Sequence, residues 1–134
     1  KNIYCELLTA ANQQSLDDVR RIWNEMPKNV RKHPDVIIAY VKQLLRFAHT
    51  TNEVEELIRK TLKQQWQPEL ARIYSTLPFT NLNRQLVIVG AWLKMYGPHQ
   101  ESLLVLGRLC TRVQLWGKAK DYFDMSQRLK ERLK

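Results

Sequence analysis

The feature that most constrains the fold of this chain is a pair of helical patterns that recurs 65 positions later in the sequence. Val54 in the first copy, for example, corresponds to Ala119 in the second. Apolar residues over 52–64 fall on one face of a helix, and a second helix is predicted just upstream, over 34–48. Such a recurring pair predicts a repeat protein, in which each pair buries its apolar face against the next. The corresponding positions are Ile38 and Leu103, Val41 and Leu106, Leu45 and Cys110, Val54 and Ala119, Ile58 and Phe123, and Thr61 and Ser126.

Two further helix pairs complete the predicted array. Since 65 is about twice the 33 residues of a typical helical repeat, one more pair is expected between the two copies, with helices over 68–77 and 81–96. Pro78 and Gly97 are expected to end these two helices. The N-terminal stretch fits as a fourth pair, in which Ser15 caps a helix. We predict one all-α domain over 1–134, with three to four helix pairs in units near 1–31, 32–66, 67–98 and 99–134.

The composition is that of an ordinary globular domain. Of the 134 residues, 44% are hydrophobic and 26% are charged, which excludes a disordered chain. Four glycines and five prolines provide too few turns for an all-β sandwich. The longest nearly unbroken apolar run, residues 86–93, is too short to span a membrane. Cys5 and Cys110 lack metal-ligand spacing, so both are expected to be buried, reduced thiols.

The net charge of +9 bears on the kind of partner. Excess positive charge suits nucleic acid, an anionic membrane surface or an acidic protein. Here the basic residues are dispersed along the chain and are not interleaved with aromatic residues, so we expect no nucleic-acid partner. The remaining alternatives are an anionic membrane surface, an acidic partner and a basic surface that is simply solvated.

The last predicted helix pair resembles the tetratricopeptide repeat (TPR). Leu106, Gly107, Ala119 and Phe123 match positions where that family has small residues and an aromatic, at a period of about 34 residues. The resemblance implies a right-handed α-α superhelix, in which the small residues let the two helices of a repeat approach closely and the aromatic ring fills the gap. The chain departs from the pattern at Lys42, Val54 and Gly90.

Longer strings resemble the C-terminal repeat domain of the HemY family of proteobacteria, which is implicated in protoheme biogenesis. The similar strings are residues 15–27, 31–34, 66–74 and 103–123, so the resemblance covers nearly the whole chain. It implies a soluble domain, on the cytoplasmic side of the bacterial inner membrane, that is part of a longer protein anchored by N-terminal helices. It also implies protein partners among the enzymes of late haem synthesis, and it carries over no catalytic residues.

The candidate site is the concave wall that the first helices of stacked pairs form. Arginines beside small residues there suit a helix or an extended peptide with carboxylates, because guanidinium groups bind carboxylates bidentately. The same wall could hold the propionates of a porphyrin, so a haem or porphyrin carrier is the alternative to a protein-interaction scaffold. The residues expected to face this groove are Gln43, Arg46, Phe47, Ala71, Arg72, Ser75, Leu104, Arg108, Thr111 and Arg112.

The sequence contains no recognisable catalytic motif, so no enzyme, resident cofactor or metal site is expected. His33, His49 and His99 each lack a second ligand at metal-binding spacing. Haem ligation by one of these histidines or by Cys110 is the alternative to a structural role.

Two tryptophans are expected to be structural. Trp66 precedes Pro68 and can pack against the first turn of the helix that follows, although Trp66 and Tyr74 could instead form a stacking platform for a ligand. Trp116 is expected to cover the open end of the core, beside a tight turn at Gly117. A contact between Trp116 and haem is the weaker alternative.

Overall fold

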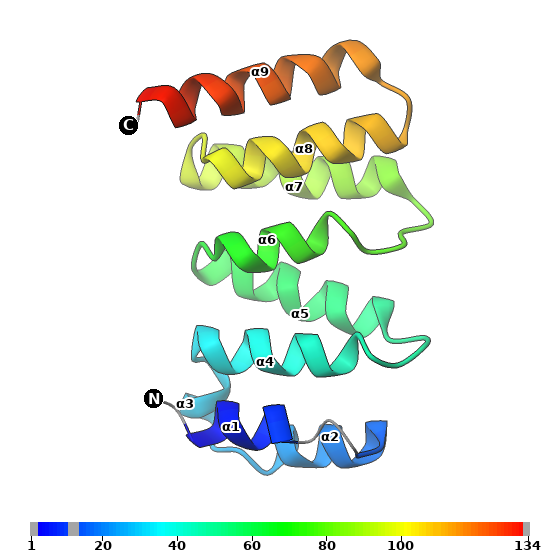
Figure 1. The fold of residues 1–134 in the computed structure, drawn as a ribbon, viewed down its shortest axis with the longest axis vertical. Helices are drawn as coiled ribbons and strands as arrows, with labels where there is room; N and C mark the ends of the chain where they lie inside the picture. Colours follow the sequence, from blue (N-terminus) through cyan, green and yellow to red (C-terminus); the bar gives the residue numbers. More distant parts are fainter. Residues whose placement is uncertain (1–2, 11–13, 133–134) are drawn as a thin grey trace. The chain divides into compact units, whose positions relative to one another are not determined.

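The computed structural model describes residues 3–10 and 14–132, and in these ranges every regular element is an α-helix. The predicted all-α class is therefore confirmed for this part of the chain. Figure 1 shows the helices in chain order. Their bounds are α1 (Ile3–Ala10), α2 (Leu16–Asn24), α3 (Lys28–Arg31), α4 (Pro34–Leu44), α5 (Thr51–Gln64), α6 (Pro68–Tyr74), α7 (Leu82–Tyr96), α8 (Gln100–Arg112) and α9 (Trp116–Arg132).

Internal contacts divide the chain into two compact units, residues 1–54 and residues 55–134. The division falls within α5, so this helix contributes its first turn to the first unit and its later turns to the second. The four repeat boundaries proposed from the sequence stay a prediction.

The first unit is built around α4, which packs against α1, α2 and α3. Trp23 of α2 stacks on Tyr40 of α4, with ring centroids 4.2 Å apart and planes 4° from parallel. Helix α2 begins at the predicted cap, because the Ser15 hydroxyl accepts the backbone N–H of Asp18 at 3.2 Å. The apolar core of this unit includes Leu8, Val19, Met26, Val36, Ile37, Val41 and Leu44.

The second unit is built around α8, which packs against α6, α7 and α9. Helices α8 and α9 run antiparallel as a hairpin (Figure 1). A Cβ atom added to Gly107 of α8 would lie 2.5 Å from the ring of Phe123 of α9. Ala119 is also buried at this seam. The close approach predicted at Gly107 is thus confirmed, because only a residue without a side chain leaves room for the Phe123 ring.

The predicted end of α7 at Gly97 is confirmed, and the helix begins one residue after the predicted start at residue 81. The side chain of Asn81 accepts the backbone N–H of Arg84 at 3.1 Å, which caps the helix. The helix ends at Gly97, whose φ of 77° lies in the region that favours glycine.

Two helices end earlier than predicted, and one helix was not predicted. Helix α4 ends at Leu44 and not at residue 48, because the Thr50 hydroxyl donates to the Leu44 carbonyl at 2.9 Å and His49 adopts a φ of 63°. Helix α6 ends at Tyr74 and not at residue 77. The short helix α3 has too few residues to show a period in the sequence.

The predictions for Trp116, Gly117 and Cys5 are wrong. Trp116 begins α9 and is 63% exposed, so it does not cover the core. The tight turn is made by Gln114, with a φ of 63°, because the Leu115 N–H closes α8 by donating to the Cys110 carbonyl at 2.8 Å. Gly117 lies inside α9. Both cysteines are free thiols, but only Cys110 is buried; Cys5 is partly exposed.

Candidate binding face on helices α6 and α8

Two arginines of α8 reach across to the end of α6 within the second unit. Arg108 and Arg112 are one turn apart, so they project from the same side of α8. Nη1 of Arg108 donates to Oγ of Ser75 at 3.3 Å. Nη1 of Arg112 donates to the carbonyls of Ser75, at 3.3 Å, and Leu77, at 2.9 Å. These carbonyls follow the last turn of α6, where the negative end of the helix dipole favours a cation.

A third arginine joins the same two helices further toward the start of α8. Nη2 of Arg72, on α6, lies 3.2 Å from Oε1 of Glu101, on α8. The side chain of Arg72 remains 52% exposed, while that of Glu101 is 20% exposed. Oε2 of Glu101 is buried and accepts no hydrogen bond within the part of the chain that the structure describes. We refer to Arg72, Ser75, Glu101, Arg108 and Arg112 together as the arginine face.

The arginine face can bind an anionic group. A guanidinium carries five N–H donors, and the contacts described above use one nitrogen of each arginine. Donors therefore remain for carboxylate oxygens, which guanidinium groups bind in a forked geometry. The contacts between α6 and α8 hold the arginines in place, which lowers the entropy lost when a partner binds.

The ten residues predicted to face a groove differ in exposure. Gln43, Ala71 and Ser75 are buried, and the expectation that they face outward is wrong. Ala71 packs in the core side of α6, and Ser75 is enclosed because its Oγ donates to the Arg72 carbonyl and accepts from Arg108. The exposed or partly exposed residues are Arg46, Phe47, Arg72, Leu104, Arg108, Thr111 and Arg112.

Arg46, Gln43 and Phe47 interact with one another in the first unit. Nη1 of Arg46 donates to Oε1 of Gln43 at 2.6 Å, and its guanidinium lies 5.0 Å from the centroid of the Phe47 ring. In the second unit, the Thr111 hydroxyl donates to the Gly107 carbonyl within α8, and Leu104 is partly buried. The arginine face itself therefore comes from α6 and α8 alone.

Trp66 belongs to an aromatic cluster and not to an open platform. Its ring stacks on His99, with centroids 5.1 Å apart, and packs edge-on against Trp92 at 6.1 Å. Tyr74 is fully buried and packs edge-on against Trp92 at 5.1 Å. Because these rings cover one another, their arrangement favours the structural interpretation of Trp66 and Tyr74.

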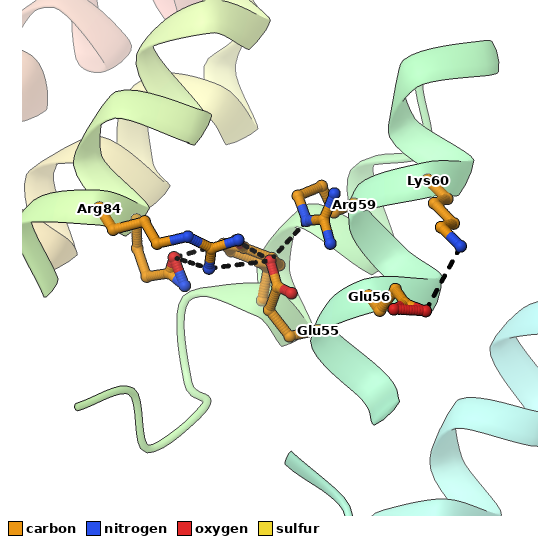
Figure 2. A network of polar contacts seen from close by, with 7 residues as sticks. Glu55, Glu56, Arg59, Lys60 and Arg84 are labelled. Atoms are coloured by element: carbon orange, nitrogen blue, oxygen red, sulfur yellow. Dashed lines mark hydrogen bonds and ion pairs between the residues drawn. The ribbon is translucent and has the colours of Figure 1, made fainter. Parts of the chain in front are cut away.

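A buried polar network centred on Glu55 was not predicted from the sequence. Oε2 of Glu55 accepts the Tyr74 hydroxyl at 2.8 Å and Nε of Arg59 at 3.0 Å, and it lies 3.9 Å from Nη1 of Arg84 (Figure 2). The Tyr74 hydroxyl also lies 3.4 Å from Oε1 of Gln85. Burial, together with the hydrogen bond to Glu55, raises the pKa of Tyr74 well above its usual range. In the sequence, Glu55 looks like one of several acidic residues in a first turn, and only its burial in the folded chain distinguishes it.

The described residues contain no group of three or more histidine, cysteine, aspartate or glutamate side chains that could hold a metal ion. His33 and His99 directly precede α4 and α8, and His49 lies in the turn between α4 and α5. Burial raises the pKa of the Cys110 thiol, which makes its thiolate form less accessible. Within the described ranges, no helix has both the length and the apolar character needed to cross a membrane.

Comparisons of this chain with protein-family models, with curated proteins and with solved structures find no match.

Proposed function

We propose that this chain is a TPR-like protein-interaction scaffold that acts in a late step of protoheme biosynthesis at the bacterial inner membrane. The pathway and the location come from the resemblance of the sequence to the HemY family. The binding role is carried by one observation, the gathering of three arginines on the adjoining helices α6 and α8. In this proposal the helix pairs stack as a right-handed superhelix, and the arginine face lies on its concave side.

The packing of α8 and α9 supports the repeat architecture. In the TPR pattern, small residues bring two helices together and an aromatic fills the gap, and Gly107 with Phe123 has that geometry. The contact of α8 with α6 supports the stacking of successive first helices, since these two open consecutive predicted pairs. A wall made of first helices is the surface that stacked helix pairs offer to a partner.

The partner we propose is an acidic segment of an enzyme of late haem synthesis. Two of its carboxylates would bind the half-exposed guanidinium group of Arg72 and the partly buried one of Arg108. A hydrogen bond to a charged group contributes about 1.5–3 kcal/mol, so two such contacts would account for a large share of a micromolar affinity. Arg112 is held by two backbone carbonyls of the segment that follows α6, and we assign it mainly to holding α6 and α8 together.

The test is a capture experiment with an immobilised chain and a detergent extract of proteobacterial inner membranes. We expect the wild-type chain to enrich at least one enzyme that acts on coproporphyrinogen or protoporphyrin. The double variant R72Q/R108Q should lose at least about tenfold of that enrichment, because one charge-assisted contact alone exceeds the 1.4 kcal/mol that corresponds to tenfold. A neutral amide replaces each guanidinium, so the variant removes the charge and the forked donors while it keeps a polar group on a shorter side chain.

The control variant is K118Q/K130Q, which removes the same two charges from exposed positions of α9. If it loses as much enrichment as R72Q/R108Q, the attraction is one of net charge and the arginine face is not the site. If the wild-type chain enriches no enzyme of haem synthesis, the proposed pathway is wrong. A saturable Soret shift on titration with micromolar haem, absent in R72Q/R108Q, would replace the scaffold with a porphyrin carrier.

A further inference from the structure

A pocket of about 250 Å³ lies between α8 and α9, away from the arginine face. Both helices belong to the second unit, where they pack as a hairpin (Figure 1). The residues that line the pocket are Pro98, Leu103, Met125, Arg128, Leu129 and Arg132.

The lining combines an apolar floor with two cations. Met125, Arg128, Leu129 and Arg132 follow one another at spacings of three, one and three, so they share one face of α9. Leu103 is buried and belongs to the core of α8. Met125 is 41% exposed, and its flexible thioether can adapt to a guest. The lining thus offers both apolar contact and the positive charge of two guanidinium groups.

Among the described residues, Arg128 and Arg132 form no ion pair with a carboxylate, and Nε of Arg128 reaches only the Asp124 carbonyl of its own helix, at 3.4 Å. The nearby carboxylate of Asp124 is held by Lys120 at 2.8 Å, which keeps the pKa of Asp124 below its usual range. Two guanidinium groups one turn apart therefore line the pocket with no direct ion pair among the described residues, and the charge of Arg128 adds to that of Lys120 in lowering the pKa of Asp124.

The size and the chemistry of the lining select the occupant. A partner helix is about 10–12 Å across with its side chains, which is too broad to enter a pocket of 250 Å³. An extended peptide would bury N–H and C=O groups against Leu103, Met125 and Leu129, which offer no hydrogen-bond partners. A single aliphatic chain has no such groups to satisfy, and a carboxylate at its end matches the forked guanidinium groups.

We propose that this pocket binds a free single-chain amphiphile with a carboxylate head, of the class of medium-chain fatty acids. The aliphatic chain packs on Pro98, Leu103 and Leu129, and the carboxylate binds Arg128 and Arg132. This site is separate from the arginine face, so the two proposals stand or fall independently.

The test is a titration of the chain with sodium decanoate below its critical micelle concentration. Calorimetry and amide chemical shifts measure the binding. We expect saturable one-to-one binding, with shifts confined to the first half of α8 and the second half of α9. Decan-1-ol, which has the same chain without the charge, should bind at least tenfold more weakly. The double variant R128Q/R132Q should lower decanoate affinity at least tenfold and leave decanol affinity unchanged.

The control K118Q/K130Q carries the same change of charge on α9 and should retain decanoate binding, as should R72Q/R108Q. Equal affinities for decanoate and decanol, or an equal loss in the control, would overturn the proposal. So would an absence of saturable binding, or shifts spread over the whole chain. Vesicles of phosphatidylglycerol form the last arm: if they bind through the same arginines and decanoate does not compete, the site belongs to a membrane surface and not to a free amphiphile.

Discussion

Glu55 and Glu56 are neighbours in α5 that have opposite surroundings. The side chain of Glu55 is 9% exposed and accepts from Tyr74 and Arg59, whereas that of Glu56 is 54% exposed and pairs with Lys60 at 3.3 Å (Figure 2). A buried carboxylate depends on its donors, because removing one partner leaves the others unsatisfied in an apolar environment. An exposed pair four residues apart on a helix contributes only a few tenths of a kcal/mol.

The same substitution at these two positions is therefore expected to have different effects. E55Q replaces the charged acceptor of the Tyr74 hydroxyl by a weaker neutral one, and we expect it to lower the free energy of unfolding by about 2 kcal/mol. E56Q should change it by less than about 0.5 kcal/mol. Urea denaturation of both variants measures this difference. Equal effects of the two substitutions would mean that the network around Glu55 does not stabilise the fold.

At the scale of elements, the close packing of the α8–α9 hairpin depends on a glycine at position 107. The Phe123 ring occupies the space where a Cβ atom of residue 107 would be. Gly90, in contrast, lies inside α7, and apart from its chain neighbours and the nearby backbone of its own helix no atom of the described residues lies within 4 Å of such a Cβ position. Alanine favours a helix over glycine by about 0.5–1 kcal/mol wherever its methyl group fits. An alanine substitution at Gly90 therefore reports helix propensity alone, whereas the same substitution at Gly107 also reports the packing against Phe123.

We expect G90A to stabilise the protein by about 0.5–1 kcal/mol and G107A to destabilise it by about 1–3 kcal/mol, the usual cost of overpacking. In the F123A background the ring is absent, so G107A should become neutral or stabilising. Thermal denaturation of the single and double variants checks the coupling. An unchanged penalty of G107A in the F123A background would show that the ring is not the cause.

Element ends were predictable from the sequence where one residue determines them. Ser15 and Gly97 act through their own side chain or their own φ, so a local rule was sufficient. The ends of α4 and α8 depend on hydrogen bonds that later residues donate back to the helix, from the Thr50 hydroxyl and from the Leu115 N–H. Neither threonine nor leucine is a typical helix terminator. This is why His49 and Gln114 adopt a positive φ that the sequence did not reveal.

The candidate site was predictable only in part for a similar reason. Helical spacing put Arg108 and Arg112 on one face, and the structure brings both to the end of α6. Spacing did not reveal that Ser75 is enclosed there, nor that Glu101 pairs with Arg72, because both depend on which helix lies opposite. The burial of Glu55 was missed for the same reason.

At the scale of the whole molecule, each compact unit contains one buried tyrosine beside a glutamate of α5. In the first unit the Tyr40 hydroxyl lies 3.5 Å from Oε2 of Glu53, whose Oε1 accepts Nη2 of Arg20 at 2.6 Å. In the second unit Tyr74 donates to Glu55. Burial, reinforced by Glu53, raises the pKa of Tyr40 to about 12, and burial with Glu55 raises the pKa of Tyr74 further.

These shifts predict that both units lose stability in alkaline solution. A raised pKa means that the folded state holds the phenolic proton more tightly than the unfolded state, whose tyrosines titrate near pH 10. The stabilisation is therefore complete below about pH 10 and is lost as the pH rises toward the folded-state pKa, near 12 for Tyr40. Between pH 9 and pH 11 we expect a loss of about 1 kcal/mol for each tyrosine.

Phenylalanine variants assign that loss to the two units, because Y40F and Y74F each remove one titrating hydroxyl. Each variant should be less stable than the wild type at pH 8, since a hydrogen bond is lost, but its stability should decline less steeply between pH 9 and pH 11. Denaturant unfolding followed by circular dichroism at a series of pH values measures the slope. Lysines also titrate in this range, but they do so in the variant and in the wild type alike. The difference between the two slopes therefore measures the contribution of the tyrosine. Parallel pH profiles for wild type, Y40F and Y74F would show that neither hydroxyl is held by its unit as the geometry requires.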